Sequence, residues 1–104
     1  MSLMYTCKRT YESSAFQLIG YSQANQTLLV IFRTGQALEY YQVAPFVFKN
    51  LLLSESVGRS YHAGIKGQFP SQKWTEQQTK AFLKAFEKAE REQLIKVSIL
   101  ESEL

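Results

Sequence analysis

The side chains most suited to ligand chemistry lie in one short segment, at positions 58–66. It combines a guanidinium at Arg59, a phenol at Tyr61, an imidazole at His62 and an ammonium at Lys66. Cations close to the backbone N–H groups of a helix start favour phosphate binding. The glycine spacing matches neither a P-loop nor a dinucleotide fingerprint. A structural turn with solvated charges is the alternative, and the sequence leaves both interpretations open.

Catalytic and metal-binding signatures are weak in this chain. His62 is the only histidine and Cys7 the only cysteine, and no aspartate is present. A general base needs an orienting carboxylate and a nucleophile, and no spacing of glutamates or serines indicates such a set. One histidine and one distant cysteine are a poor metal site. We therefore predict that the protein is not an enzyme and has no metal or cofactor.

The charge is mildly basic and unevenly distributed. The formal net charge is +3 with a pI near 9.1, and residues 1–74 hold seven basic but only three acidic side chains. Polyanion binding combines such cations with aromatic rings on which bases stack. The candidate nucleic-acid-binding residues are Arg59, Lys66, Lys49 and Lys73 for phosphates, and Tyr41 and Tyr61 for stacking. Packing of the tyrosines in the core is the alternative, and it is the role we expect for Tyr40.

These candidates must be positioned by a meander of three strands between Phe16 and Pro45. Turn-forming residues at 22–26 and at 34–35 separate three apolar segments, and the middle one, 27–33, is typical of a central strand covered on both faces. If Thr34 and Gly35 form a two-residue hairpin loop, alternation places side chains on two faces. The core face would carry Leu29, Ile31, Leu38 and Tyr40. The other face, which would be exposed or lightly covered, would carry Val30, Phe32, Ala37, Glu39 and Tyr41. A bulge at Gly35 would shift the register of the hairpin.

Helices are predicted after the meander. Pro45 suits a helix start, and the residues from Phe46 to Ser54 are apolar nearly all round, which indicates a buried helix on the sheet. Ser56 can cap a short helical turn through Tyr61. Thr75 and Gln78 form the pattern of a capping box that opens a long amphipathic helix with an apolar stripe at Ala81, Phe82, Ala85, Phe86 and Ala89. We favour continuation of this helix to about Leu100, although residues 95–99 alternate as a strand would.

Residues 13–70 resemble a KTSC domain, a small module named for the C-terminus of some lysyl-tRNA synthetases and also found as a free-standing bacterial protein. The matching motifs, in order and spacing, are Ile19-Gly20-Tyr21, Leu28-x-Val30-x-Phe32, Gly35, Glu39-Tyr40, Ser56-Val57-Gly58-Arg59, Tyr61 and Ile65-Lys66. The family's Tyr-x-Tyr falls on Leu38-Glu39-Tyr40, so its first tyrosine is absent. The resemblance implies a possible RNA-binding module.

The predicted organisation is one α+β domain with a three- to four-stranded antiparallel meander, a buried helix, a short helical turn and a C-terminal amphipathic helix. We divide it into an arm or edge strand at 1–12, a core at 13–70, a link at 71–74, and a helix at 75–104 that could end in a short strand. No apolar run reaches the length of a membrane span. The lone cysteine and the absence of a signal-peptide pattern predict a cytoplasmic protein.

The leading functional hypothesis is a non-catalytic module that binds RNA or another nucleic acid. The alternative is a protein-interaction or self-assembly module, with a protein partner or a homodimer formed through an open sheet face (Phe32, Tyr41) or the C-terminal helix.

Overall fold

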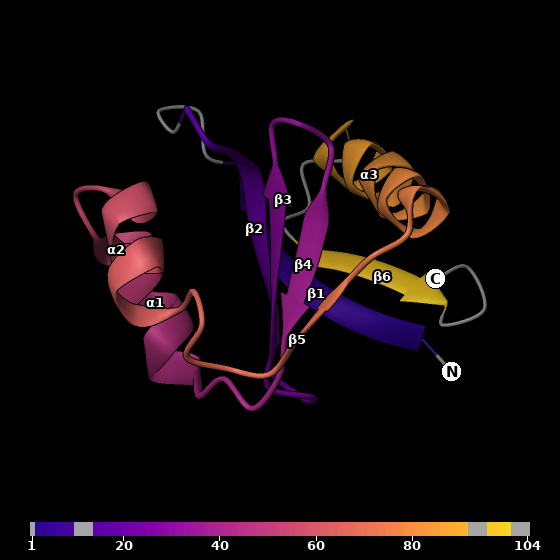
Figure 1. Ribbon diagram of the computed structural model, residues 1–104. Helices are drawn as coiled ribbons and strands as arrows, with labels where there is room; N and C mark the ends of the chain where they lie inside the picture. The colour runs from indigo at the N-terminus through magenta and orange to yellow at the C-terminus, as the bar shows by residue number, and fades with distance from the viewer. Residues whose placement is uncertain (1, 10–13, 92–95, 101–104) are drawn as a thin grey trace.

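The computed structural model describes residues 2–9, 14–91 and 96–100. Within these ranges six strands form one antiparallel sheet in the order β5-β4-β3-β2-β1-β6, accompanied by three helices (Figure 1). The predicted α+β class is therefore confirmed, and β2, β3 and β4 form the predicted meander. The elements in chain order are β1 Ser2–Arg9, β2 Phe16–Ser22, β3 Thr27–Phe32, β4 Ala37–Tyr40, α1 Pro45–Leu53, α2 Val57–Gly64, β5 Ser71–Lys73, α3 Glu76–Arg91 and β6 Lys96–Leu100.

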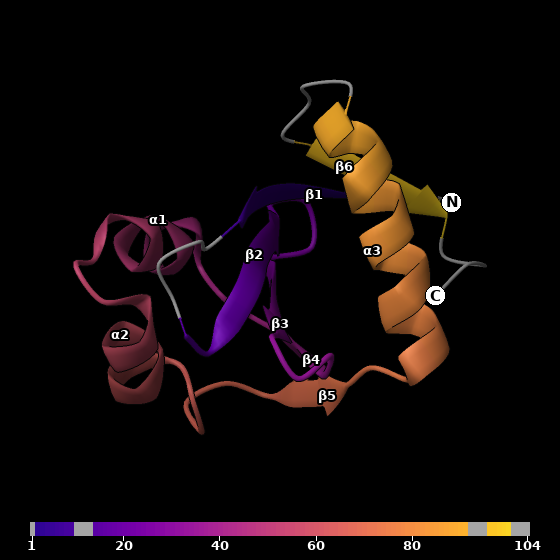
Figure 2. The same cartoon turned by 90° about the horizontal axis from the view of Figure 1, so that it is seen from above.

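A helical layer covers each face of the sheet, with α1 and α2 on one side and α3 on the other (Figures 1 and 2). The α3-side core consists of Tyr5, Cys7, Leu18, Leu29, Ile31, Ala37, Trp74, Phe82, Phe86 and Ala89. The helix-pair core consists of Phe16, Ile19, Tyr21, Leu28, Val30, Tyr40, Val43, Phe48, Leu51, Tyr61 and Ile65. Strand β3 contributes to both cores, because successive side chains of a strand point to opposite faces. This confirms a central strand covered on both faces.

The hairpin between β3 and β4 differs from the predicted one by a single residue. Leu28 lies opposite Tyr40 and Val30 opposite Leu38, whereas a two-residue loop would place Leu29 opposite Tyr40. The loop is longer because Gly35 adopts a left-handed φ of 95°, a conformation that glycine accepts readily. Since a one-residue shift exchanges the faces, Leu38 and Tyr40 share the helix-pair face with Val30. The predicted assignment of the faces was therefore wrong for β4.

Helices cover the part of the sheet around Phe32 and Tyr41, in contrast to the open surface predicted there, whereas Met4 of β1 remains 54% exposed. Phe32 packs against the helix-pair core, and its ring centroid lies 5.0 Å from that of Phe16. Tyr41 is half-buried on the α3 side. A second helical layer removes the exposed sheet face on which one version of the self-assembly hypothesis depended.

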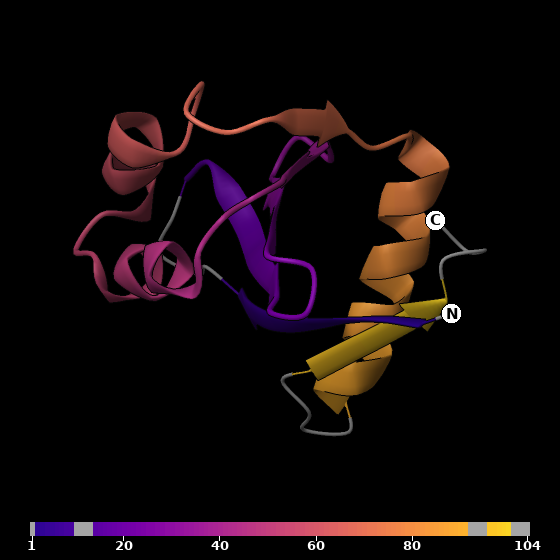
Figure 3. The ribbon, with the colours of Figure 1, turned by 90° about the horizontal axis from the view of Figure 1, so that it is seen from below.

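Both ends of the chain extend the sheet. Residues 2–9 form β1, which lies between β2 and β6 rather than at an edge. Figure 3 shows β6, in yellow, beside β1, in indigo. The favoured helix to Leu100 was therefore wrong, because α3 ends at Arg91 and residues 96–100 pair with β1 as a strand. The predicted link at 71–74 also forms a strand over most of its length, since β5 pairs with β4.

Helix α3 begins as its sequence predicts. The Thr75 N–H donates to Gln78 Oε1 at 2.8 Å, and the Gln78 N–H donates to Thr75 Oγ1 at 3.1 Å. These two bonds are the reciprocal pair of a capping box. The apolar stripe then packs on the sheet, where the Phe82 ring makes edge contacts with Tyr5 and Trp74. The apolar stripe of α3 is therefore part of the core.

Candidate functional site

Helices α1 and α2 form the helix-pair layer, and β5 is the edge strand of the sheet near it. Four exposed cations lie on these elements or next to them. Lys49 is on α1, Arg59 on α2, Lys66 directly after α2, and Lys73 on β5. Lys73 lies opposite Leu38, whose side chain packs on the helix-pair core, so Lys73 shares that face of the sheet. Within the described ranges none of the four makes an ion pair with a carboxylate. The predicted phosphate contacts therefore fall on one layer.

The start of α2 is capped from within the chain. Ser56 Oγ accepts a hydrogen bond from the Arg59 N–H at 3.3 Å, which confirms the predicted cap. This occupies one of the backbone donors that a phosphate at the helix start would use. Attraction of an anion to this region therefore depends mainly on the side chains of Arg59 and Lys66.

Tyr61 does not belong to the surface. Its side chain is 3% exposed, and its ring makes an edge contact with Phe16. Its hydroxyl forms a hydrogen bond with the hydroxyl of Tyr40 in the buried interior. Burial and the Tyr40 hydroxyl raise the pKa of Tyr61. The predicted stacking role for Tyr61 was therefore wrong, because helix α2 turns this ring inward, while the predicted core position of Tyr40 is confirmed.

Tyr41 lies apart from the cations, on the α3 side of the sheet. Its hydroxyl donates to Glu39 Oε1 at 2.6 Å and to Gln72 Oε1 at 3.1 Å. The buried Tyr5 hydroxyl donates to the other oxygen of Glu39 at 2.9 Å. Burial and the neighbouring Glu39 raise the pKa of both phenols, that of Tyr41 to about 12. These bonds form a structural network, and Tyr41 does not join Arg59 and Lys66 in one site.

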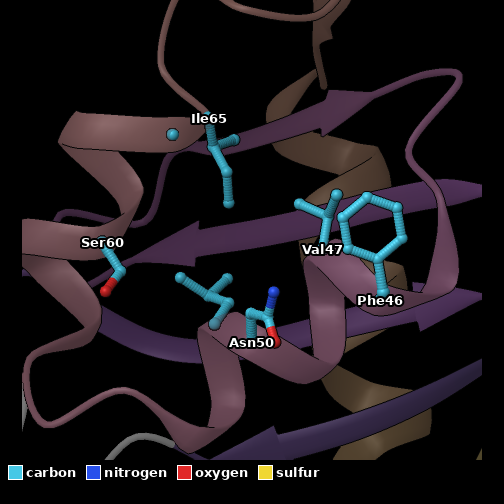
Figure 4. Close-up of a pocket in the computed structure, with 7 residues that line it drawn as sticks. Phe46, Val47, Asn50, Ser60 and Ile65 are labelled. Carbon is cyan, nitrogen blue, oxygen red and sulfur yellow. The ribbon is translucent and has the colours of Figure 1, made fainter.

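A groove lies between α1 and α2 in the helix-pair layer. Its volume is about 260 Å³, and its lining is Phe46, Val47, Asn50, Leu51, Ser60, Gly64 and Ile65. Figure 4 shows Phe46, Val47 and Asn50 projecting from α1, with Ser60 and Ile65 on the facing segment. Ligand pockets commonly occupy a few hundred Å³ with mostly apolar walls and a few polar groups. The groove has this character.

Phe46 is a surface residue that sequence reasoning placed in a buried helix. It is 65% exposed, and Leu53 at the other end of α1 is 73% exposed. Only Phe48 and Leu51 of this helix are buried. The sequence did contain a signal for this exposure, which is the large number of apolar residues in α1. A helix that packs on a sheet buries only one face, so some of these residues must remain exposed. Large apolar side chains left on the outer face indicate an interaction surface.

His62 and Cys7 are the two other side chains that the sequence offers for catalysis or metal binding. His62 is exposed and makes an edge contact with the ring of Tyr61. Burial raises the pKa of the Cys7 thiol to about 12, which disfavours the reactive thiolate. The described residues contain no group of three or more histidine, cysteine or acidic side chains placed to bind a metal ion. Their helices also lack the combined length and hydrophobicity that crossing a bilayer requires.

Comparison with known proteins identifies similar chains. The KTSC domain family matches residues 12–69. A protein of Tsukamurella paurometabola is 43% identical over 58 residues, which are 56% of this chain and 87% of that protein. A lysine–tRNA ligase of Nostoc punctiforme is 36% identical over 58 residues, which are 56% of this chain but 10% of the ligase. The crystal structure of a KTSC domain protein from Yersinia pestis has 30% identity and a TM-score of 0.61, and covers 66% of this chain and 99% of that one.

The matched range divides the molecule in two. It contains the meander, α1 and α2, and therefore the groove and three of the four exposed cations, Lys49, Arg59 and Lys66. Strands β1, β5 and β6 and helix α3 lie outside it. The candidate site thus belongs almost entirely to the part of the chain that its relatives share.

Proposed function

The chain belongs to the KTSC domain family, and we propose that it is a non-catalytic module that binds RNA through its helix-pair layer. Lys49, Arg59, Lys66 and Lys73 would contact phosphates, as the sequence suggests. Phe46 would take the stacking role first assigned to Tyr61, because Phe46 is an exposed phenyl ring on this layer. The cytoplasmic location remains a prediction that accords with an RNA partner.

The observation that supports this proposal most strongly is the surplus of unpaired positive charge on one layer. Between residues 44 and 74 the chain has four basic side chains and a single acidic one, Glu55. Cations without carboxylate partners are free to replace the counterions of a phosphate backbone, and this release is the main source of sequence-independent affinity. The relative within a lysine–tRNA ligase, an enzyme that by its name acts on tRNA, is consistent with an RNA partner.

The test is a fluorescence-anisotropy titration of the full chain with labelled single-stranded RNA, single-stranded DNA and duplex over a range of salt concentrations. Four phosphate contacts predict a slope of log affinity against log salt of about −3 for a single strand, since each contact contributes about −0.7. The double variant Arg59→Ala, Lys66→Ala should make this slope shallower by about 1.4.

A matched control removes the same charge from the opposite layer. Lys84 and Lys88 are exposed on α3, and the double variant Lys84→Ala, Lys88→Ala should keep the wild-type slope. The proposal fails if no RNA binds at low salt. It also fails if the two double variants change the slope equally, because the attraction would then arise from net charge and not from the helix-pair layer.

Protein interaction is a second candidate function, favoured by the exposed apolar side chains of Phe46 and Leu53 at the two ends of α1. Such side chains at the centre of an interface are buried when a partner or a second copy binds. Light scattering over a range of concentrations tests the second-copy version. A mass that rises with concentration and returns to the monomer value in Leu53→Ser would support self-association, whereas a constant monomer mass would exclude it.

A further inference from the structure

The groove between α1 and α2 has walls suited to a flat, partly apolar group. Leu51 and Ile65 are each 2% exposed and form its apolar base together with the half-buried Val47. The Phe46 ring lies at the groove (Figure 4), and it is 65% exposed. Gly64 adds no side chain to the wall, and a Cβ built there would meet no atom within 4 Å. The groove is therefore open on the side of Gly64.

Polar groups in the same groove have unused hydrogen-bonding capacity. The Asn50 side chain offers two donors and one acceptor, and among the described residues its amide makes no hydrogen bond. The Ser60 hydroxyl is similarly without a hydrogen-bond partner in that part of the chain. A purely apolar side chain of a protein partner would leave these groups unused. The edge of a nucleobase, which presents both donors and acceptors, would use them.

Three cations are next to residues of the groove lining in the sequence. Lys49 precedes Asn50, Arg59 precedes Ser60, and Lys66 follows Ile65 in the sequence. All three cations are exposed, and none forms an ion pair within the described ranges. The groove thus combines an exposed ring and a free amide, and the same two-helix segment carries exposed cations, which together complement a nucleotide: a flat base attached to an anionic backbone.

We propose that this groove holds one unpaired base of a bound RNA strand, with the base stacked on Phe46 and its edge bonded to Asn50. The inference rests on the proposed RNA-binding function and adds to it the place where a base is bound. Binding of this kind tolerates many sequences, because every base has a face that can stack. It also requires a single strand, because a paired base is unavailable for insertion.

The experiment compares two labelled probes with the full chain: oligouridylate, and a strand of the same length and charge that is abasic throughout. Phe46→Ala should weaken binding of oligouridylate by about 5- to 100-fold, the usual range for loss of one aromatic stacking partner. Asn50→Ala should weaken it by about two- to tenfold through lost hydrogen bonds. Neither variant should change binding of the abasic strand.

A steric test uses a pair of glycines on α2. Gly64 lines the groove and Gly58 does not, and a Cβ added at either position meets no atom within 4 Å. Gly64→Leu should reduce oligouridylate affinity about as strongly as Phe46→Ala, while Gly58→Leu leaves it unchanged. Leu53→Ala, an exposed position of α1 outside the groove lining, is the matched control for Phe46→Ala. Thermal melting of each variant verifies that the fold is intact.

The outcomes separate the two proposals. If wild type binds oligouridylate and the abasic strand with equal affinity, or if Phe46→Ala affects both probes equally, the base subsite is overturned while RNA binding through phosphates stands. If the wild type binds neither probe at low salt, both proposals are overturned. If Leu53→Ala and Phe46→Ala reduce affinity equally, the groove has no special role and an extended apolar contact replaces it.

Discussion

The two helical layers cover opposite faces of one sheet, yet they present different surfaces to solvent. On the α3 side, the largest apolar residues, Phe82, Phe86 and Trp74, are buried. On the helix-pair side, two large apolar residues, Phe46 and Leu53, remain exposed on the outer face of α1. Both layers therefore supply a core, and the large apolar side chains exposed among the described residues are Phe46 and Leu53 of α1 and Met4 of β1, with none on α3.

Polar and charged groups follow the same division. On the α3 side, Arg9 donates two hydrogen bonds to the carboxylate of Glu90, at 2.8 and 3.0 Å, and its guanidinium lies 4.9 Å from the centroid of the Phe86 ring. On the other side, Lys49 and Arg59 make no ion pair within the described ranges. Residues 76–91 of the first layer have four basic and three acidic side chains, so its charge is nearly balanced, whereas the second layer retains a positive excess that an external anion could neutralise.

The boundary of the family match explains this difference. The α3 layer, with β1, β5 and β6, lies outside residues 12–69, and it covers a sheet face whose side chains would otherwise be exposed. We conclude that the added elements act mainly in stability, since burial of apolar surface is the dominant favourable term in folding. The shared elements combine a core with an outer surface, and the proposed functions use that surface.

The largest expected effect is a difference in the free energy of unfolding between alanine variants of two phenylalanines, one from each layer. Phe82→Ala should lower the free energy of unfolding by about 3–5 kcal/mol, the usual cost of removing a buried aromatic ring. Phe46→Ala should change it by no more than about 0.5 kcal/mol, because the ring is exposed. Urea unfolding of the two variants measures the difference. Similar losses of unfolding free energy in both variants would show that Phe46 stabilises the fold as much as Phe82 does, which would contradict the contrast between the two layers.

An intermediate effect concerns the buried tyrosine pair in the helix-pair core. Tyr40→Phe or Tyr61→Phe alone should cost about 1–3 kcal/mol, because each leaves the other hydroxyl buried without its partner. The double variant should cost less than the sum of the two, since both polar groups are then removed. A double-mutant cycle in urea measures this coupling. Simple additivity would mean that the hydroxyl–hydroxyl bond does not hold α2 on the sheet.

The smallest expected effect is a loss of folding stability at alkaline pH, caused by two tyrosines on the α3 side. Burial and Glu39 raise the pKa of Tyr5 and Tyr41 above the ordinary value of 10.0, for Tyr41 to about 12. The unfolded chain therefore loses these protons first, so the stability they contribute is complete below pH 10 and is lost as the pH rises toward 12. Glu39→Gln removes the carboxylate and should make this loss less steep.

Urea unfolding at several pH values between about 8 and 11 measures this slope. Glu55→Gln is the matched control, because Glu55 is an exposed carboxylate between the two helices of the other layer and should retain the wild-type slope. Equal slopes in wild type and Glu39→Gln would show that Glu39 does not raise the pKa of these tyrosines and that burial alone does.

Local patterns predicted the parts of the fold in which neighbouring residues make the decisive contacts. The cap at Ser56, the capping box at Thr75 and Gln78, and the core position of Tyr40 were all confirmed. Prediction failed where a partner distant in the sequence decides the structure. Residues 96–100 form a strand because β1, at the other end of the chain, offers an unpaired edge.

The candidate site shows the same limit. The cations were identified from composition, and exposure of Lys49, Arg59, Lys66 and Lys73 agrees with that identification. Tyr61 was misassigned because the sequence does not state which face of the short helix meets the sheet. Phe46 was missed for the same reason, since its position on the outer face depends on how α1 rotates about its own axis as it packs.

The sequence by itself determined the secondary-structure signals, the family and the excess of basic residues, because spacing, capping and charge are properties of short segments. Only the tertiary structure decided that both faces of the sheet are covered, that Gly35 shifts the register of β4, and that a groove opens between α1 and α2 beside Phe46. The physical reason is that burial is collective. A side chain becomes core or surface according to what packs against it, and that partner can lie at the far end of the chain.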